Sequence, residues 1–216
     1  MGRPLRLKGP NLTYHITSRT NGGRLFLKKT KDQKVLCKII NRVLLKYNVL
    51  GHGLTPMNNH FHLIIHIKDK ADLSQVMCEI KTQYAKYHNK KYNTKGIFWG
   101  GRFHSTIIED DYHMLICLRY IDRNPLKAGL VDHPSKWHLA TFRQYAYGEP
   151  HPLLHIQPHP TYTALSEDPA KRQRMYSEFV LGPNHAADDL HGRMRRMRVF
   201  GSEDFINQIK CKICLL

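Results

Sequence analysis

Apolar residues follow two different spacings along this chain, and together they predict a mixed α and β fold. The stretch Tyr14–Ser18 alternates and is rich in β-branched residues, which is typical of a strand, whereas apolar residues 36–47 recur at helical spacing. Applied to the first 130 residues, these spacings predict strand 14–18, helix 32–48, strand 50–57, strand 59–67, helix 72–92, strand 103–108 and helix 110–123. This order lacks the regular repeats of a parallel sheet. It predicts an α+β fold with helices packed on an antiparallel sheet, of ferredoxin-like or RRM-like type.

Local signals predict the start of the first of these helices and the end of the third. Thr30-Lys31-Asp32-Gln33 has the form of a capping box, which predicts the start of the first helix. Asn124-Pro125 predicts that the third helix ends near Arg123, because the residue before a proline avoids the helical region.

Composition changes near residue 149 and divides the chain into three predicted parts. Residues 1–148 form the predicted domain. Residues 149–160 contain four prolines and predict a linker, so we expect its histidines to lie in a loop. Residues 161–216 form a basic C-terminal extension, with a predicted helix over 170–180 and a run of basic residues from Gly192 to Arg198.

Strand 59–67 carries the most informative pattern in the chain. Its odd positions are apolar, whereas three of its even positions are His60, His62 and His66. Because side chains alternate across a strand, one face is predicted to pack in the core and the other to carry imidazoles. The pattern therefore predicts that His60 and His62 point to the same side, close enough to share a divalent metal. A His-x-His pair alone is weak evidence, since most such pairs are ordinary surface or core histidines.

The charge of the chain favours a polyanionic partner. Its 216 residues include 34 Lys and Arg but only 17 Asp and Glu, a formal net charge of +17. An excess this large indicates nucleic acid rather than a simple need for solubility. No apolar stretch is long enough to span a membrane, and we expect a cytoplasmic, nucleoid-associated protein.

Five scattered cysteines are typical of a reducing compartment. We expect Cys37, Cys78 and Cys117 to be small buried apolar residues, since each lies in an apolar helical pattern. Cys211 and Cys214 have CxxC spacing, but without a second pair this is weak evidence for zinc, and a free thiol pair is the default interpretation.

Tyr120 is the second candidate for chemistry. It lies four residues before Asn124, so the two share a helix face if the helix extends that far. A phenol beside a metal can act as a nucleophile. The alternative is a core tyrosine at a helix terminus.

Four motifs resemble those of the REP-associated tyrosine transposases, single-tyrosine members of the HUH nuclease superfamily. The motifs are Tyr14–Arg19, Met57–Leu63, Trp99–Phe103 and Arg119–Val131, and they appear in family order over about residues 10–148. One departure is Asn58, where the family carries proline. The resemblance implies an HUH endonuclease domain over residues 1–148.

This resemblance implies a role for each matching residue. His60 and His62 would bind Mg²⁺ or Mn²⁺, Asn124 would complete the ligand set, and Tyr120 would be the nucleophile. It also implies a metal-dependent transposase that cleaves and rejoins single-stranded DNA through a 5′-phosphotyrosine intermediate, at repetitive extragenic palindromic (REP) hairpins. We expect a monomer, although a dimer that exchanges tyrosine helices is an alternative.

Basic and aromatic residues near the motifs are candidates for DNA binding. These candidates are Lys81, Trp99, Arg102, Arg195 and Arg196. Phe98 and Trp99 are expected to stack on bases, and the basic side chains to contact phosphates. Two alternative functions remain open from the sequence: a hairpin-binding protein without catalysis, and a metal-dependent phosphodiester hydrolase in which the tyrosine is structural.

Overall fold

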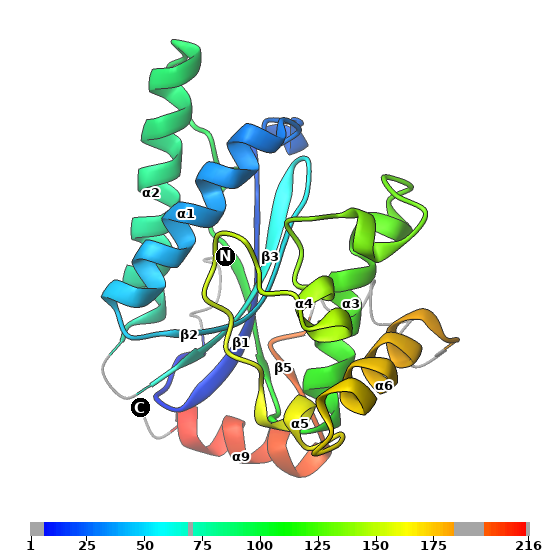
Figure 1. Ribbon diagram of the computed structural model, residues 1–216. Helices are drawn as coiled ribbons and strands as arrows, with labels where there is room; N and C mark the ends of the chain where they lie inside the picture. Colours follow the sequence, from blue (N-terminus) through cyan, green and yellow to red (C-terminus); the bar gives the residue numbers. More distant parts are fainter. Residues whose placement is uncertain (1–6, 69–70, 184–196, 215–216) are drawn as a thin grey trace.

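A mixed sheet of five strands, in the order β2-β3-β1-β4-β5, forms the centre of the computed structural model (Figure 1). The structure describes residues 7–68, 71–183 and 197–214. Its elements are β1 (Leu12–Arg19), η1 (Asn21–Gly23), α1 (Thr30–Lys46), β2 (Leu50–Pro56), β3 (His60–Ile67), α2 (Leu73–Tyr92), β4 (His104–Ile108), α3 (Tyr112–Lys127), η2 (Pro134–Lys136), α4 (Phe142–Tyr147), α5 (Pro160–Thr163), α6 (Pro169–Leu181), β5 (Val199–Phe200) and α9 (Glu203–Cys214). The α+β class and the order of the first seven predicted elements are confirmed.

The four strands that the sequence predicts are paired antiparallel, whereas a fifth strand pairs parallel. β1 pairs antiparallel with both β3 and β4, and β2 with β3. The short strand β5 pairs parallel with β4. A pair of adjacent residues, Val199 and Phe200, is too short to give a strand pattern, so the sequence did not predict it.

Helices cover both faces of the sheet. α1 and α2 lie on one side in Figure 1, and α3 lies on the other with α4 and α6 beyond it. Phe61 on β3 contacts Trp99, which contacts Tyr84 of α2. On the opposite face a Cβ on Gly53 of β2 would lie only 2.8 Å from Ile121 Cδ1, so this glycine allows α3 to pack closely on the sheet.

The predicted capping box of α1 does not form. The helix begins at Thr30 after Lys29, and no side chain caps it. Asp32 is buried and accepts hydrogen bonds from Tyr87, Lys91 and Tyr92 at the end of α2. The carboxylate therefore ties α1 to α2 instead of capping a helix end.

The predicted end of the third helix is also wrong. α3 continues through Pro125 to Lys127. Proline disfavours a helix interior because it lacks an N–H and its ring crowds the preceding turn. Here the side-chain Nδ2 of Asn124 donates to the carbonyl of Tyr120 at 2.7 Å, which supplies a hydrogen bond in the turn next to the proline.

Of the predicted linker 149–160, residues 149–159 form no helix, whereas Pro160 begins α5; residues 149–159 pack against the sheet. Leu154 and Ile156 are buried, and the backbone N–H of Gln157 donates to the carbonyl of Gly51 in β2. The predicted helix over 170–180 is α6, which begins after the Asp168 cap. The proposed division into a domain, a linker and an extension stays a prediction.

Two of the three expected buried cysteines are buried. Cys37 and Cys117 lie in the core, whereas Cys78 is exposed on α2, which corrects that prediction. Cys78 follows two buried residues in an apolar pattern, but its own position falls outside the buried stripe of the helix. Cys211 is exposed, and the side chain of Cys214 lies outside the described residues. Among the described helices, none combines the length and apolar character that crossing a membrane requires.

Candidate functional site

Two imidazoles meet on the face of β3 that α3 covers. His60 and His62 point to the same side of the strand, as predicted from their spacing. Their Nε2 atoms lie 3.1 Å apart, and their rings are nearly perpendicular, at 81°. The two nitrogens therefore converge on one point.

The other ring nitrogen of His60 is held by its neighbour in the chain. His60 Nδ1 lies 2.6 Å from Asn59 Oδ1. An amide oxygen only accepts, so Nδ1 carries the proton and Nε2 has the lone pair. This is the tautomer that a metal ligand requires.

His62 is held from the neighbouring strand β1. Thr17 lies opposite His62 in the register, and its Oγ1 is 3.2 Å from His62 Nδ1. His15 Nε2 is closer, at 2.9 Å from the same nitrogen. Both partners can accept a proton from Nδ1, which leaves the lone pair on the Nε2 of His62, the atom that faces His60 Nε2.

His15 is a member of this cluster that the sequence analysis did not single out. Its side chain is 1% exposed, and burial, with smaller contributions from His104 and His60, lowers its pKa to about 3. It is therefore neutral near pH 7 and can accept a hydrogen bond. The alternation in Tyr14–Arg19 places His15 and Thr17 on one face, but only the pairing of β1 with β3 brings that face beside His62.

Tyr120 lies directly against the imidazoles. Its ring centroid is 5.3 Å from that of His62 and 5.7 Å from that of His15, in edge-to-face contacts. The side chain is 5% exposed. The close approach of α3 at Gly53 keeps this tyrosine within reach of the sheet.

Asn124 follows Tyr120 by one turn on the same face of α3, as predicted. It is buried, and the hydrogen bond from its Nδ2 to the Tyr120 carbonyl fixes the amide. The oxygen Oδ1 is then the atom that could bind a cation.

These side chains line a pocket of about 820 Å³ between the sheet and α3. The lining residues are His15, Thr17, Arg19, Met57, Asn59, His60, His62, Arg102, His104, Tyr120, Asn124, Lys127 and Ala128. Arg19, Arg102 and Lys127 are basic, and none of the lining residues is acidic. The pocket suits an anion such as a phosphodiester.

The donor atoms fit a divalent cation. Two nitrogens that bind one metal at about 2.1 Å and near a right angle lie about 3 Å apart, which agrees with the 3.1 Å between His60 Nε2 and His62 Nε2. The amide oxygen of Asn124 would add a hard ligand of the kind that Mg²⁺ and Mn²⁺ prefer. A cation held by these three side chains would keep coordination positions for a phosphate oxygen.

The predicted DNA-binding residues fall in different places. Arg102 is exposed and lines the pocket. Trp99 is only 6% exposed, and its Nε1 donates to the carbonyl of Lys81 on α2. Neither Trp99 nor Phe98, at 3%, presents an open face for stacking. Arg195 and Arg196 lie outside the described residues.

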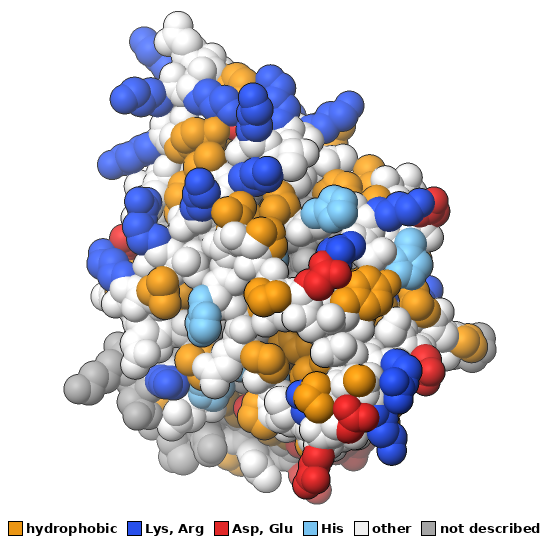
Figure 2. All heavy atoms as spheres, in the orientation of Figure 1, with side chains coloured by type: hydrophobic (Ala, Val, Ile, Leu, Met, Phe, Trp, Pro, Cys, Tyr) orange, Lys and Arg blue, Asp and Glu red, His pale blue; other side chains and the backbone are white. Residues whose placement is uncertain are grey.

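Positive charge extends well beyond the pocket. Figure 2 shows Lys and Arg side chains gathered over α1 and α2, whereas near α5 and α6 Asp and Glu lie among further Lys and Arg. The side formed by α1 and α2 is therefore basic in this view, which favours approach of a polyanion.

Known proteins resemble this chain in sequence and in fold. Residues 9–124, just over half of the chain, match the family described as "Transposase IS200 like". A Haemophilus influenzae protein named REP-associated tyrosine transposase is 28% identical over 105 residues, 44% of this chain and 59% of that protein. The match thus spans less than two thirds of that relative.

A solved structure shares the fold. It is the REP-associated tyrosine transposase bound to a REP hairpin, with a TM-score of 0.59 and 24% identity, over 68% of this chain and 87% of that one. The mixed sheet and its packed helices therefore follow the fold of that protein.

Proposed function

Since the chain belongs to the IS200-like transposase family, we propose that it cleaves and rejoins single-stranded DNA at REP-type hairpins, with Tyr120 as the nucleophile. The observation that carries this proposal is the position of Tyr120, whose ring lies 5.3 Å from His62 beside the converging nitrogens of His60 and His62. A nucleophile and a candidate metal site meet in one basic pocket.

The reaction exchanges one ester of phosphorus for another. The phenol oxygen of Tyr120 forms a bond to the scissile phosphorus as the phenol loses its proton. The bond from phosphorus to the 3′ oxygen breaks, and that oxygen leaves with a proton as a 3′-hydroxyl. The 5′ end stays attached as a phosphotyrosine ester, so rejoining by a 3′-hydroxyl needs no external energy source.

The side chains of the pocket have separable tasks in this reaction. Arg19, Arg102 and Lys127 would hold the phosphodiester and balance its charge. His60, His62 and Asn124 would hold Mg²⁺ or Mn²⁺. When bound, such a cation polarises a non-bridging phosphate oxygen and stabilises the charge that develops there.

The proposed substrate rests on charge and on the named relatives. The formal net charge of +17 favours nucleic acid, and two similar proteins carry REP-associated transposase in their names. One of them is bound to a REP hairpin in its solved structure.

A covalent adduct is the direct test of this function. The protein is incubated with Mn²⁺ and labelled single-stranded DNA that carries a REP-type hairpin with unpaired flanks, then run on a denaturing gel. We expect a labelled protein band that disappears in Tyr120→Phe, while hairpin binding by that variant is retained. Cleavage without a labelled band would indicate hydrolysis, and binding without cleavage would indicate a protein that only binds hairpins.

A further inference from the structure

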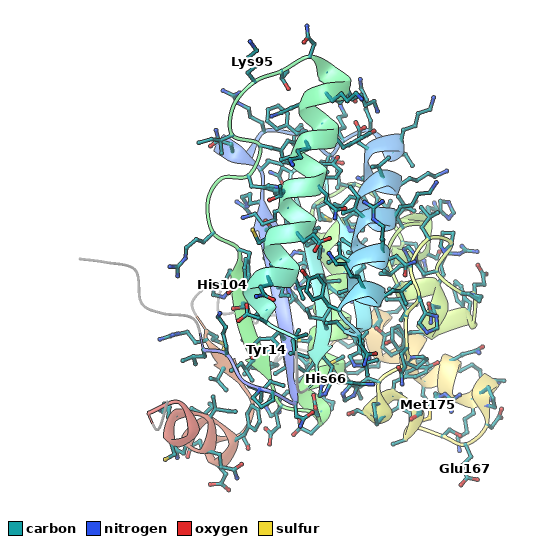
Figure 3. All side chains as sticks on the ribbon, turned by 90° about the vertical axis from the view of Figure 1, so that its left-hand side faces the viewer. Tyr14, His66, Lys95, His104, Glu167 and Met175 are labelled. Carbon is teal, nitrogen blue, oxygen red and sulfur yellow. The ribbon has the colours of Figure 1, made fainter. Side chains whose placement is uncertain are left out.

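A second cavity lies beside the catalytic pocket, between α2 and residues 96–103. Its volume is about 470 Å³. Figure 3 shows this segment running alongside α2, from Lys95 at the end of the helix to His104 at the start of β4. The lining residues of this α2 groove are Ser74, Cys78, Lys81, Thr82, Ala85, Gly96, Ile97, Phe98, Trp99, Gly101, Arg102 and Phe103.

The α2 groove adjoins the catalytic pocket at one side chain. Arg102 lines both cavities and is exposed. A phosphodiester chain that passes through the catalytic pocket can therefore extend along Arg102 into the α2 groove.

The walls of the α2 groove are fixed to one another. Trp99 Nε1 donates to the carbonyl of Lys81 at 2.9 Å, and Lys81 Nζ donates to the carbonyl of Gly101 at 2.5 Å. These two hydrogen bonds clamp the loop to the helix from both directions. The groove is thus largely formed before a ligand arrives, as binding sites usually are.

The lining of the α2 groove combines the chemical features of an unpaired nucleotide. Three aromatic residues that are almost fully buried, Phe98, Trp99 and Phe103, line it and form its apolar floor. Lys81 and Arg102 add positive charge, and no acidic side chain lines the groove. A base can pack on the apolar floor while its phosphate lies by the cations.

We propose that the α2 groove receives the unpaired DNA nucleotides that flank the scissile phosphate. The inference rests on the proposed function, since it takes the catalytic pocket as the place of cleavage. It gives Trp99 and Phe98 a role as the floor of a groove for bases, in place of an open stacking platform. Affinity for flanked hairpins should therefore depend on the small residues along the α2 side of the groove.

Two DNA hairpins that differ only in an unpaired flank test this assignment. The probes are a DNA hairpin with blunt ends and the same hairpin with an unpaired thymidine flank, and the protein is the Tyr120→Phe variant, so that no probe is cleaved. Base stacking of this kind adds roughly tenfold to affinity. We expect the flank to raise affinity by about that factor.

Two exposed positions on α2 allow the groove to be blocked without touching the core. Cys78→Phe and Thr82→Phe both introduce a ring into the groove from exposed sites. Each should abolish the gain that the flank provides and leave binding of the blunt hairpin unchanged. Gln75→Phe, at an exposed α2 position outside the groove, is the matched control and should keep the gain. An equal gain in all three variants, or no gain in the parent, overturns the inference.

The thiol of Cys78 gives an independent readout in the same protein. It is exposed in the groove, and Cys211 is exposed on α9, outside its lining. We expect the flanked hairpin to slow alkylation of Cys78 by N-ethylmaleimide relative to the blunt hairpin, with Cys211 unaffected. Equal alkylation of Cys78 with both probes contradicts the inference.

Failure of the inference can be told apart from failure of the proposed function. Wild-type protein is assayed for the covalent adduct on the same flanked hairpin. An adduct together with an unprotected Cys78 means that Tyr120 acts as proposed and the flank lies elsewhere. No adduct in any metal condition rejects the proposed function, whereas protection of Cys78 still reports on the groove.

Discussion

The imidazole of His15 lies parallel to that of His62, with ring centroids 5.1 Å apart and His15 Nε2 2.9 Å from His62 Nδ1. Through this contact β1 controls the orientation of a residue on β3. A metal-binding histidine is commonly fixed by a hydrogen bond to its second nitrogen. His15 and Thr17 together provide that support here, in place of a carboxylate.

Removing this support should weaken cation binding. Loss of a residue that orients a metal ligand typically costs about 10- to 100-fold in metal affinity. We expect His15→Ala to lower the affinity for Mn²⁺ by a factor in that range, measured in a Mn²⁺ titration followed by electron paramagnetic resonance. His15→Gln, whose amide can still accept from His62 Nδ1, should recover much of the loss. If His15→Ala bound Mn²⁺ as tightly as the wild-type protein, the contact from Thr17 alone would be enough to orient His62.

Asn124 should affect the metal requirement more than the binding of DNA. Asn124→Ala removes the amide oxygen and the hydrogen bond to the Tyr120 carbonyl, so cleavage should need a higher Mn²⁺ concentration. Asn124→Asp keeps an oxygen ligand and should restore cleavage at low Mn²⁺. Equal metal dependence in the alanine and wild-type proteins would remove Asn124 from the ligand set.

Salt dependence separates phosphate contacts from charge elsewhere. For single-stranded DNA, each contacted phosphate contributes about −0.7 to the slope of log affinity against log salt. Arg102→Gln should reduce the magnitude of the slope by about that amount. Lys46→Gln removes the same charge from a residue that pairs with Glu79, outside both cavities, and should leave the slope unchanged. Identical slopes in all three proteins would place Arg102 away from the DNA.

A buried carboxyl on α3 makes stability depend on pH. Burial raises the pKa of Asp122 to about 7, although Tyr176 and Thr141 donate to it. Between about pH 3.9, where the unfolded chain ionises, and pH 7, the folded protein binds more protons, so stability falls as pH rises. The free energy of unfolding should drop by up to about 4 kcal/mol over that interval.

Urea unfolding at a series of pH values measures this effect. The Asp122→Asn side chain cannot ionise, so most of the decline in the free energy of unfolding should disappear in this variant. Asp168→Asn, at the exposed cap of α6, is the control and should show the same decline as the wild-type protein. If the free energy of unfolding declined equally in Asp122→Asn and in the wild-type protein, the decline would come from other titratable groups.

The sequence predicted which side chains share one face of a strand better than it predicted helix ends. Period-two alternation placed His60 and His62 on one face, because a strand fixes side-chain direction regardless of its neighbours. Asp32 followed a tertiary contact instead, because it binds α2, and such contacts between distant residues leave no local pattern. Pro125 lies in a turn that the Asn124 side chain supports, a contact within the helix that the general rule for the residue before a proline does not include.

His15 and β5 could not be derived from local spacing alone. His15 matters because the register places β1 beside β3, and that pairing is a property of the whole sheet. β5 forms where β4 offers an unpaired edge to a later part of the chain. The pairing of strands, rather than the residues of one strand, decides both features.

Mass spectrometry of the protein after reaction with DNA tests the central claim most directly. The adduct is treated with nuclease and protease, and the peptide that carries the remaining nucleotide is sequenced. The account predicts a 5′-linked nucleotide on Tyr120, formed only when Mg²⁺ or Mn²⁺ is present. A nucleotide attached to another residue, or complete cleavage with no modified peptide, would contradict it.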